Sequence, residues 1–255
     1  MCLLLIAWKV HPRYELLVAA NRDEHHARPT APLDYWPDAP GVVAGRDLVA
    51  AGTWLATLPD GRFATVTNFR DEATSAVGPR SRGELVMRFF DSGLAPDAFT
   101  AALAADHAQY AGFNLVVGDQ EQLVYASNRT RQFSQPLAPG LHGLSNHQLG
   151  TPWPKVRQGL RALRSHVDTG HDSVEPLFDA LLEQQLDQTI NEAAPAGALP
   201  WPASSGPFIS QEQFGTRATT LLWRDNANHI CIEERRFAPR GVPTGRSRIT
   251  LGATQ

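Results

Sequence analysis

The sequence predicts an α+β fold in which antiparallel sheets are covered by helices. Short apolar runs joined by turn residues occur near both ends of the chain. Between them lie segments with apolar residues at three- and four-residue spacing, the period of an amphipathic helix. Hairpins at both ends with helices between them favour antiparallel sheets with helices packed on them. The specific expectation is a four-layer αββα sandwich, with two stacked sheets between helical layers.

The N-terminal third is expected to form two hairpins. Turn residues at 11–13 and the Pro-Asp-Gly sequence at 59–61 separate the paired runs, and such residues typically connect antiparallel strands. A stretch rich in Pro, Asp and Gly, residues 28–40, is expected to be a loop between the hairpins. The expected strands are residues 3–8, 14–20, 53–58 and 62–67.

The middle of the chain is expected to be mostly helical and its C-terminal end to be sheet. Pro96 is typical of a first helical turn, and Gly93 ends the helix before it. The expected helices are residues 82–90, 96–107, 153–167 and 173–186. The expected strands are residues 113–117, 122–126, 217–223, 229–235 and 248–251. Residues 193–207, rich in Pro, Ala, Ser and Gly, are expected to form a loop that is a candidate lid.

Composition indicates one conventional domain, residues 1–255. The chain has 42% hydrophobic residues and a net charge of −3, which disfavours a nucleic-acid partner. No apolar run reaches the roughly 18 residues that span a bilayer. The N-terminal apolar run lacks a basic start and a small-residue cleavage site, so we interpret it as a buried strand. Two cysteines form no disulfide framework, and the expected location is the cytoplasm.

Cys2 is the first candidate catalytic residue. Removal of Met1 is expected before a residue as small as cysteine, and it would give Cys2 a free α-amine beside its thiol. The amine has a reference pKa of about 7.7–8.0 and can act as a general base, while the thiolate is a strong nucleophile. The alternative interpretation is a small apolar residue at the start of a core strand.

Arg22 and Asp23 follow the strand that is expected to pair with the first one. Antiparallel pairing across the turn at 11–13 brings Asn21 back to Cys2 or just past it, so Arg22 is expected within reach of the thiol. A guanidinium there stabilises a thiolate or binds an anionic substrate group. Asp23 is a candidate partner for the arginine or the amine. The alternative is a salt-bridged loop after a strand.

Two asparagines and a late arginine complete the candidate site. Asn68 closes the run of residues 65–68 and Asn146 closes the run of residues 143–146, both interpreted as strand ends. Side-chain amides are good donors to an oxyanion. Arg217 begins an apolar strand and is a candidate second cation. The alternatives are ordinary turn capping for the asparagines and an edge position for the arginine.

Metal and cofactor sites are not expected. His25 and His26 are adjacent and would point to opposite sides of a strand, and no HExxH or cysteine pair supports them. The glycines of residues 41–45 lack the ending of a phosphate-binding loop. Cys231 lies between two isoleucines and is interpreted as a packed strand residue.

The chain resembles the NRDE family, also called the transport and Golgi organisation protein 2 family. The matching motifs occur in family order and cover nearly the whole chain, with residues 187–210 the least similar part. They are Met1-Cys2, Ala19-Ala20-Asn21-Arg22-Asp23-Glu24, Gly52-Thr53-Trp54-Leu55, Thr67-Asn68, Arg82-Gly83-Glu84-Leu85, Gly112-Phe113-Asn114-Leu115, Gly143-Leu144-Ser145-Asn146, Thr151-Pro152-Trp153 and Gly215-Thr216-Arg217.

The resemblance implies an αββα fold of the N-terminal nucleophile hydrolase type. The chain is distantly similar to cysteine-type members of that group, such as penicillin V acylase and conjugated bile salt hydrolase. The counterparts of their catalytic residues would be Cys2, Arg22, Asp23, Asn68, Asn146 and Arg217. Those enzymes separate their arginine and aspartate by two residues, whereas here the two are adjacent, which puts the amine-orienting role of Asp23 in doubt.

Two functions remain open from the sequence. The first is hydrolysis of a linear, N-acyl-type amide by Cys2, with a small-molecule substrate and no cofactor. The second is a binding or trafficking protein that holds haem or an acyl lipid without turnover, because eukaryotic relatives are linked to Golgi organisation, lipid metabolism and haem trafficking. A fold alone does not decide between them.

Overall fold

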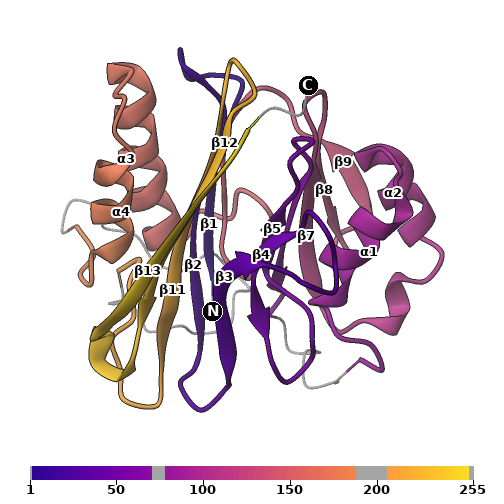
Figure 1. The fold of residues 1–255 in the computed structure, drawn as a ribbon, viewed down its shortest axis with the longest axis horizontal. Coiled ribbons are helices and arrows are strands. Elements are labelled where there is room, and N and C mark those ends of the chain that lie inside the picture. Colours follow the sequence, from indigo (N-terminus) through magenta and orange to yellow (C-terminus); the bar gives the residue numbers. More distant parts are fainter. Residues whose placement is uncertain (1, 71–77, 188–205, 253–255) are drawn as a thin grey trace. The chain divides into compact units, whose positions relative to one another are not determined.

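The computed structural model describes the whole chain except residues 1, 71–77, 188–205 and 253–255 (Figure 1). It divides into two compact units. The first contains Met1–Ala27 and Pro139–Thr250, and the second contains Arg28–Ala138 and Leu251–Gln255. Within the described residues, each unit has one sheet and two α-helices.

The first unit is a six-stranded sheet with α3 and α4 packed on one face. Apolar side chains of α3 and α4 meet those of β1, β2 and β11 in one core, which explains why the N-terminal run of the sequence is apolar throughout. The elements, in sheet order and then helices, are β10 (Gly140–Leu144), β1 (Leu3–Trp8), β2 (Tyr14–His25), β11 (Phe214–Asp225), β12 (Ile230–Phe237), β13 (Pro243–Leu251), α3 (Pro154–Thr169) and α4 (Glu175–Leu182). A short turn of 3-10 helix, η2 (Pro239–Gly241), joins β12 to β13.

The second unit is a seven-stranded antiparallel sheet that α1 and α2 cover. Its core contains Phe89, Phe99 and Phe113, each nearly or fully buried. The elements are β3 (Thr30–Tyr35), β4 (Val43–Asp47), β5 (Leu55–Thr57), β6 (Phe63–Asn68), β7 (Phe113–Gly118), β8 (Leu123–Ser127), β9 (Ser134–Pro136), α1 (Glu84–Ser92), α2 (Pro96–Leu103) and the 3-10 turn η1 (His107–Gln109).

The predicted fold class is confirmed. Each unit, in the part of the chain that the structure describes, supplies one antiparallel sheet and one helical layer, the elements that the αββα class requires. The expected first hairpin forms, with Leu3 opposite Asn21. All four expected helices are present, each within a few residues of its predicted ends.

The element prediction needs correction in several places. Strands β4 and β9 were not predicted, and the helix expected at 96–107 ends at Leu103. The expected loop at 28–40 contains β3, an edge strand in which Pro32 is tolerated because an edge position does not require its missing N–H. The expected helix at 173–186 ends at Leu182, where Glu183 adopts an extended conformation. The candidate lid at 193–207 falls outside the described residues except for its last two positions.

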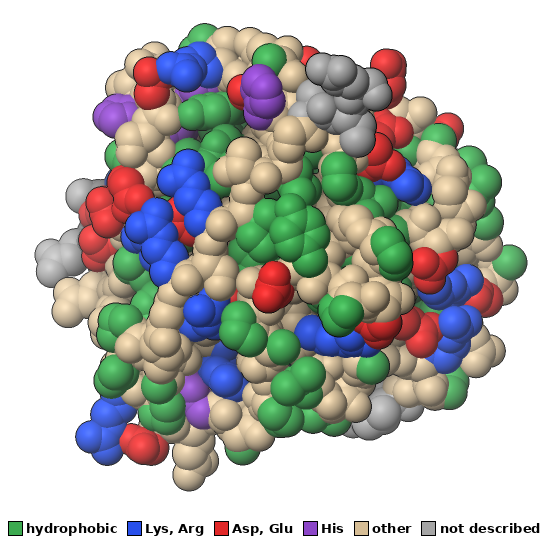
Figure 2. All heavy atoms as spheres, viewed as in Figure 1, with side chains coloured by type: hydrophobic (Ala, Val, Ile, Leu, Met, Phe, Trp, Pro, Cys, Tyr) green, Lys and Arg blue, Asp and Glu red, His purple; other side chains and the backbone are tan. Residues whose placement is uncertain are grey.

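Charged side chains of both signs mix on the surface. On the face shown in Figure 2, Lys and Arg side chains lie among Asp and Glu side chains. Ion pairs within each unit account for part of this mixing, such as Arg235 with Glu175 and Arg46 with Asp38, each at 2.7 Å. None of the helices in the described part of the chain is long and apolar enough to span a membrane.

A histidine cluster around buried His166 connects the β1–β2 turn with the end of α3. His166 stacks against His11 and His171, with ring centroids 5.3 and 6.0 Å apart. Both ring nitrogens of His166 are buried and have no hydrogen-bond partner among the described residues. Burial, reinforced by the two neighbouring histidines, lowers the pKa of His166 from 6.5 to about 4.

This cluster predicts a loss of stability in mild acid. Between pH 6.5 and about 4 the unfolded chain binds a proton at His166 that the folded chain does not, so the free energy of unfolding falls as the pH falls through this window. The expected contribution is about 2 kcal/mol once partial screening by solvent is allowed for. Urea unfolding of the wild type and of His166→Phe at pH 7 and pH 4 measures it. Parallel losses in the two proteins would contradict the assignment.

Candidate active site

The pairing of β1 with β2 places Cys2 next to Arg22. Leu3 lies opposite Asn21, and Cys2 and Arg22 are the next residues outward on their respective chains. Cys2 is partly exposed, whereas Arg22 is buried. The structure therefore brings a thiol and a guanidinium to the same end of this hairpin, as the sequence predicted.

Asn21 fixes this end of β2. Its side-chain nitrogen donates to the carbonyl oxygens of Leu181 and Pro207, at 2.8 and 2.9 Å. Its side-chain oxygen accepts a hydrogen bond of 2.7 Å from Thr219 on β11. A buried amide with these three bonds holds the strand that carries Arg22 against α4 and β11.

Asn146 binds the nitrogen of Cys2. It follows β10, the strand that pairs with β1 opposite β2, and its Oδ1 accepts a 2.7 Å hydrogen bond from the Cys2 nitrogen. Its φ of +50° lies in the left-handed region, which non-glycine residues rarely adopt and which is often found at functional sites. The amide oxygen is thus directed at the Cys2 nitrogen, while a donor role of the amide nitrogen toward an oxyanion stays a prediction.

Asp23 lies in a buried polar cluster with Thr216 and Lys155. Thr216 donates to Asp23 Oδ1 at 2.7 Å, and Lys155 Nζ lies 3.8 Å from Asp23 Oδ2. Burial raises the pKa of Asp23, while Lys155 and the Thr216 hydrogen bond act in the opposite direction. Burial lowers the pKa of Lys155, and the nearby Asp23 and Cys2 counteract it. The mutual attraction of the pair therefore offsets only part of the effect of burial, which leaves the pKa of Asp23 raised and that of Lys155 lowered.

Lys155 is the member of this cluster that the sequence analysis did not identify. It lies in the first turn of α3, where the positive end of the helix dipole disfavours a cation. The chain has two lysines, Lys9 and Lys155, and it otherwise uses arginine as its basic residue. The sequence feature that could have identified Lys155 is its position: it is a lysine in a first helical turn, in a chain whose other basic residues are almost all arginine.

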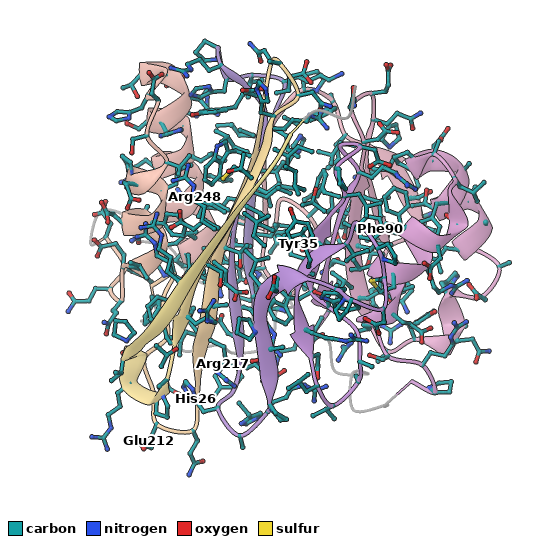
Figure 3. The ribbon with its side chains drawn as sticks, viewed as in Figure 1. His26, Tyr35, Phe90, Glu212, Arg217 and Arg248 are labelled. Atoms are coloured by element: carbon teal, nitrogen blue, oxygen red, sulfur yellow. The ribbon has the colours of Figure 1, made fainter. Side chains whose placement is uncertain are left out.

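Arg217 occupies a bulge at the end of β11. Thr216 pairs with Asp23 and Ala218 with Arg22, so Arg217 has no opposite residue. Its NH1 donates to the carbonyl oxygens of His25 and His26, at 3.0 and 3.1 Å, and Figure 3 shows Arg217 and His26 near this end of the strands. Burial lowers the pKa of Arg217. These hydrogen bonds hold the end of β2 in place. A role of Arg217 in binding substrate stays a prediction.

Asn68 lies in the second unit. It is the last residue of β6, it is exposed, and it pairs with Phe113 on β7. The structure therefore places the other predicted site residues on one unit and Asn68 on the other. Its role as an oxyanion donor stays a prediction.

Cys231 occupies a different environment from Cys2. It is buried in the core beneath α4, as predicted for a packed residue. Its sulfur accepts a 3.3 Å hydrogen bond from Arg248 of β13, which Figure 3 labels. Among the described residues no group of three or more His, Cys, Asp or Glu side chains could hold a metal ion.

Comparison with known proteins identifies the family. The Transport and Golgi organisation 2 family model matches residues 1–239. The Transport and Golgi organization protein 2 homolog of Bos taurus is 32% identical over 264 residues, and that of Homo sapiens is 30% identical, each alignment covering 92% of both chains. A Caenorhabditis elegans N-acylethanolamine-hydrolyzing acid amidase ortholog is similar at a TM-score of 0.43 and 9% identity, covering 87% of this chain and 92% of that one, too low to bear on activity. The chain belongs to the Transport and Golgi organisation 2 family.

Proposed function

We propose that this chain is a cysteine amidohydrolase that attacks a linear, N-acyl-type amide with the thiol of Cys2. The observation that carries the proposal is the position of Cys2. It is partly exposed, its nitrogen is bound by Asn146, and it lies at a strand end next to buried Arg22. A cation near a thiol favours the reactive thiolate.

In the chain without Met1, the α-amine of Cys2 is the proposed base. It takes the thiol proton, the sulfur attacks the carbonyl carbon, and the tetrahedral intermediate carries a negative oxygen. Collapse of this intermediate breaks the C–N bond, the proton passes to the leaving nitrogen, and water hydrolyses the thioester. Asn146 is the proposed oxyanion donor of this unit, and Asn68 stays a candidate that the family resemblance alone suggests.

Charge at the site favours a substrate with an anionic group. Arg22 is a candidate for binding it, because it is the charged residue opposite Cys2 at this strand end. A bidentate arginine contact to a carboxylate or phosphate orients the acyl chain relative to the sulfur. The proposal is therefore a small, linear substrate with an amide and a nearby acidic group.

A thiol-directed probe tests the nucleophile. Iodoacetamide at pH 7, followed by peptide mapping, is expected to label Cys2 at least tenfold faster than Cys231. Cys2 is partly exposed, whereas Cys231 is buried and its sulfur already accepts a hydrogen bond from Arg248. Cys2→Ala should remove the fast-reacting site, and Cys231→Ala serves as the matched control. Equally slow labelling of both cysteines would contradict a catalytic thiol.

The same variants separate turnover from binding alone. Binding of haem or a fatty-acyl ligand to Cys2→Ala is measured by absorbance titration or thermal shift. The haem or acyl-lipid binding alternative is supported if this variant binds as the wild type does and if Cys2 of the wild type reacts no faster than Cys231. If labelling is selective for Cys2, hydrolysis is supported.

A further inference from the structure

Strand register places a second arginine, Arg236, in the same row of the sheet as Arg22. Arg22 of β2 lies opposite Ala218 of β11, and Ala218 lies opposite Arg236 of β12. Directly opposite residues of antiparallel strands point to the same face of a sheet, so these three side chains share one face. The strand end that carries Cys2 and Arg22 therefore has a second cation two strands further along the row.

This face is directed away from the helices of the first unit. Asn21 donates to a backbone carbonyl of α4, and Arg235 pairs with Glu175, also of α4. Side chains alternate along a strand, so the next residues, Arg22 and Arg236, point to the opposite face. The two arginines are therefore on one side of the sheet, and the ion pairs with α4 are on the other.

The guanidinium of Arg236 is held in a defined position. Its NH1 donates to Ser247 Oγ of β13 at 2.8 Å and to Glu234 Oε1 at 3.3 Å. Gly245 of β13 leaves space for it, because a Cβ there would lie 2.6 Å from NH2. A side chain that is already ordered loses less rotamer freedom when it binds a ligand. The Arg236 side chain is also 23% exposed, so an anion can reach it.

The charges on this part of the sheet favour an anionic ligand. The next row along β2, β11 and β12 consists of Ala20, Thr220 and Glu234, which lie opposite one another. Glu234 is the one acidic residue of the two rows on these strands, whereas Arg22 and Arg236 are both basic. The two rows thus have a formal surplus of one positive charge, and an arginine fork suits a carboxylate or a phosphate.

The sheet also sets how far this cation is from the nucleophile. Neighbouring strands lie about 4.8 Å apart, so Arg236 is about 10 Å from Arg22 and about 14 Å from the strand that follows Cys2. A linear molecule as long as about three to four residues of extended chain spans this distance. An acidic group close to the reacting carbonyl would contact Arg22, and one at the far end of such a molecule would reach Arg236.

We propose that Arg236 binds a second anionic group of the substrate, at the end remote from the bond that Cys2 attacks. The inference rests on the proposed function, because it takes Cys2 as the nucleophile. It makes the substrate class more specific: a linear N-acyl-type amide with a carboxylate or phosphate about 10–14 Å from the amide. Arg236 does not touch the reacting atoms, so its role is to determine specificity.

A series of N-iodoacetyl-ω-amino acids, from glycine to 8-aminooctanoic acid, tests this role. Each probe alkylates the Cys2 thiol with loss of iodide and places its carboxylate at an increasing distance from the sulfur. The terminal carboxamides of the same lengths are the neutral partners. Rates at pH 7 over a range of probe concentrations separate the apparent dissociation constant from the limiting rate, and peptide mapping verifies that Cys2 is the labelled residue.

Three variants identify the arginine. Arg236→Gln removes the charge, and Arg236→Lys keeps a charge without the planar fork. Arg240→Gln is the matched control, because it removes one positive charge from the exposed tip of the same hairpin. The measured quantity is the ratio of the acid's dissociation constant to that of its carboxamide, so each protein serves as its own reference.

The expected preference depends on probe length. Wild type and Arg240→Gln bind the long acids about tenfold more tightly than the matching carboxamides, as a charge-assisted hydrogen bond would give. Their limiting rates are equal for acid and carboxamide. Arg236→Gln loses the preference for the long acids but keeps any preference for the glycine-length acid. Arg236→Lys retains part of the preference for the long acids.

A double variant covers the case in which Arg236→Gln does not fold. Glu234 is 2% exposed, and the loss of its arginine partner places an uncompensated charge in a buried position. Glu234→Gln combined with Arg236→Gln removes both charges. The double variant is expected to lose the preference for the long acids in the same way.

The outcomes separate this inference from its foundation. The inference is overturned if the wild type shows no preference for acids at the longer lengths. It is also overturned if the proteins without Arg236 keep that preference, or if Arg240→Gln loses it equally. In each of these cases a reactive Cys2 leaves the proposed function standing. If Cys2 of the wild type reacts with iodoacetamide no faster than Cys231, the proposed function fails and the inference fails with it.

Discussion

Replacing Asp23 by leucine is expected to lower the free energy of unfolding by about 3–5 kcal/mol. The substitution leaves the amine of Lys155 buried with no counter-charge, and removing one partner of a buried pair costs about this much. It also removes the acceptor of the Thr216 hydroxyl. Part of the cost is relieved because burial already lowers the pKa of Lys155, so the amine can become neutral. Chemical denaturation of the purified variant measures the change.

A double-mutant cycle isolates the pair. Asp23→Leu combined with Lys155→Met replaces both charges by apolar side chains and should cost less than Asp23→Leu alone, because no orphan charge remains. The matched control is the exposed pair of Arg161 with Asp187, 2.7 Å apart on the same unit. There Asp187→Ala should cost under about 1 kcal/mol. Additive losses in the cycle would show that Asp23 and Lys155 do not interact.

The part of the site that local sequence patterns could predict is the hairpin. An apolar run, a turn and a second apolar run fix the pairing of β1 with β2, and strand alternation then sets Cys2 near Arg22. Helix α3 follows from apolar residues at helical spacing and ends at Gly170, whose φ is +61°. These features depend on residues that are close in the sequence.

The remainder of the site depends on contacts between distant segments. Lys155 is buried because α3 packs beside Asp23 of β2, and no pattern around residue 155 contains that information. Arg217 binds backbone carbonyls because a bulge shifts the register of β11. The pattern of apolar and polar residues along the strand does not reveal a bulge of this kind. Strand β3 was missed because proline normally argues against a strand, and only its edge position makes Pro32 acceptable.

Family motifs that are separate in sequence also meet in the second unit. Gly52 begins one motif and Gly83 lies in another, and the two backbones are in direct contact. A Cβ on Gly52 would lie 2.5 Å from the carbonyl carbon of Gly83 and 2.6 Å from its oxygen. Thr53 donates its backbone N–H to the same oxygen at 3.2 Å. The absence of a side chain at residue 52 therefore lets the start of α1 approach the segment before β5.

Gly52→Ala is accordingly expected to destabilise the protein by about 2–3 kcal/mol. The clash is with backbone, which cannot rotate away as a side chain can, and Gly52 is itself fixed by a 2.9 Å hydrogen bond from Asp47 N to its carbonyl oxygen. Relief requires the first turn of α1 to move away from the sheet, with loss of packing around buried Leu85. The control is Gly252→Ala, where an added Cβ meets nothing within 4 Å and the change should stay within about 0.5 kcal/mol. Thermal and urea unfolding measure the stability of the two variants. An equal, small loss of stability at both positions would mean that the contact between the two motifs is loose in solution.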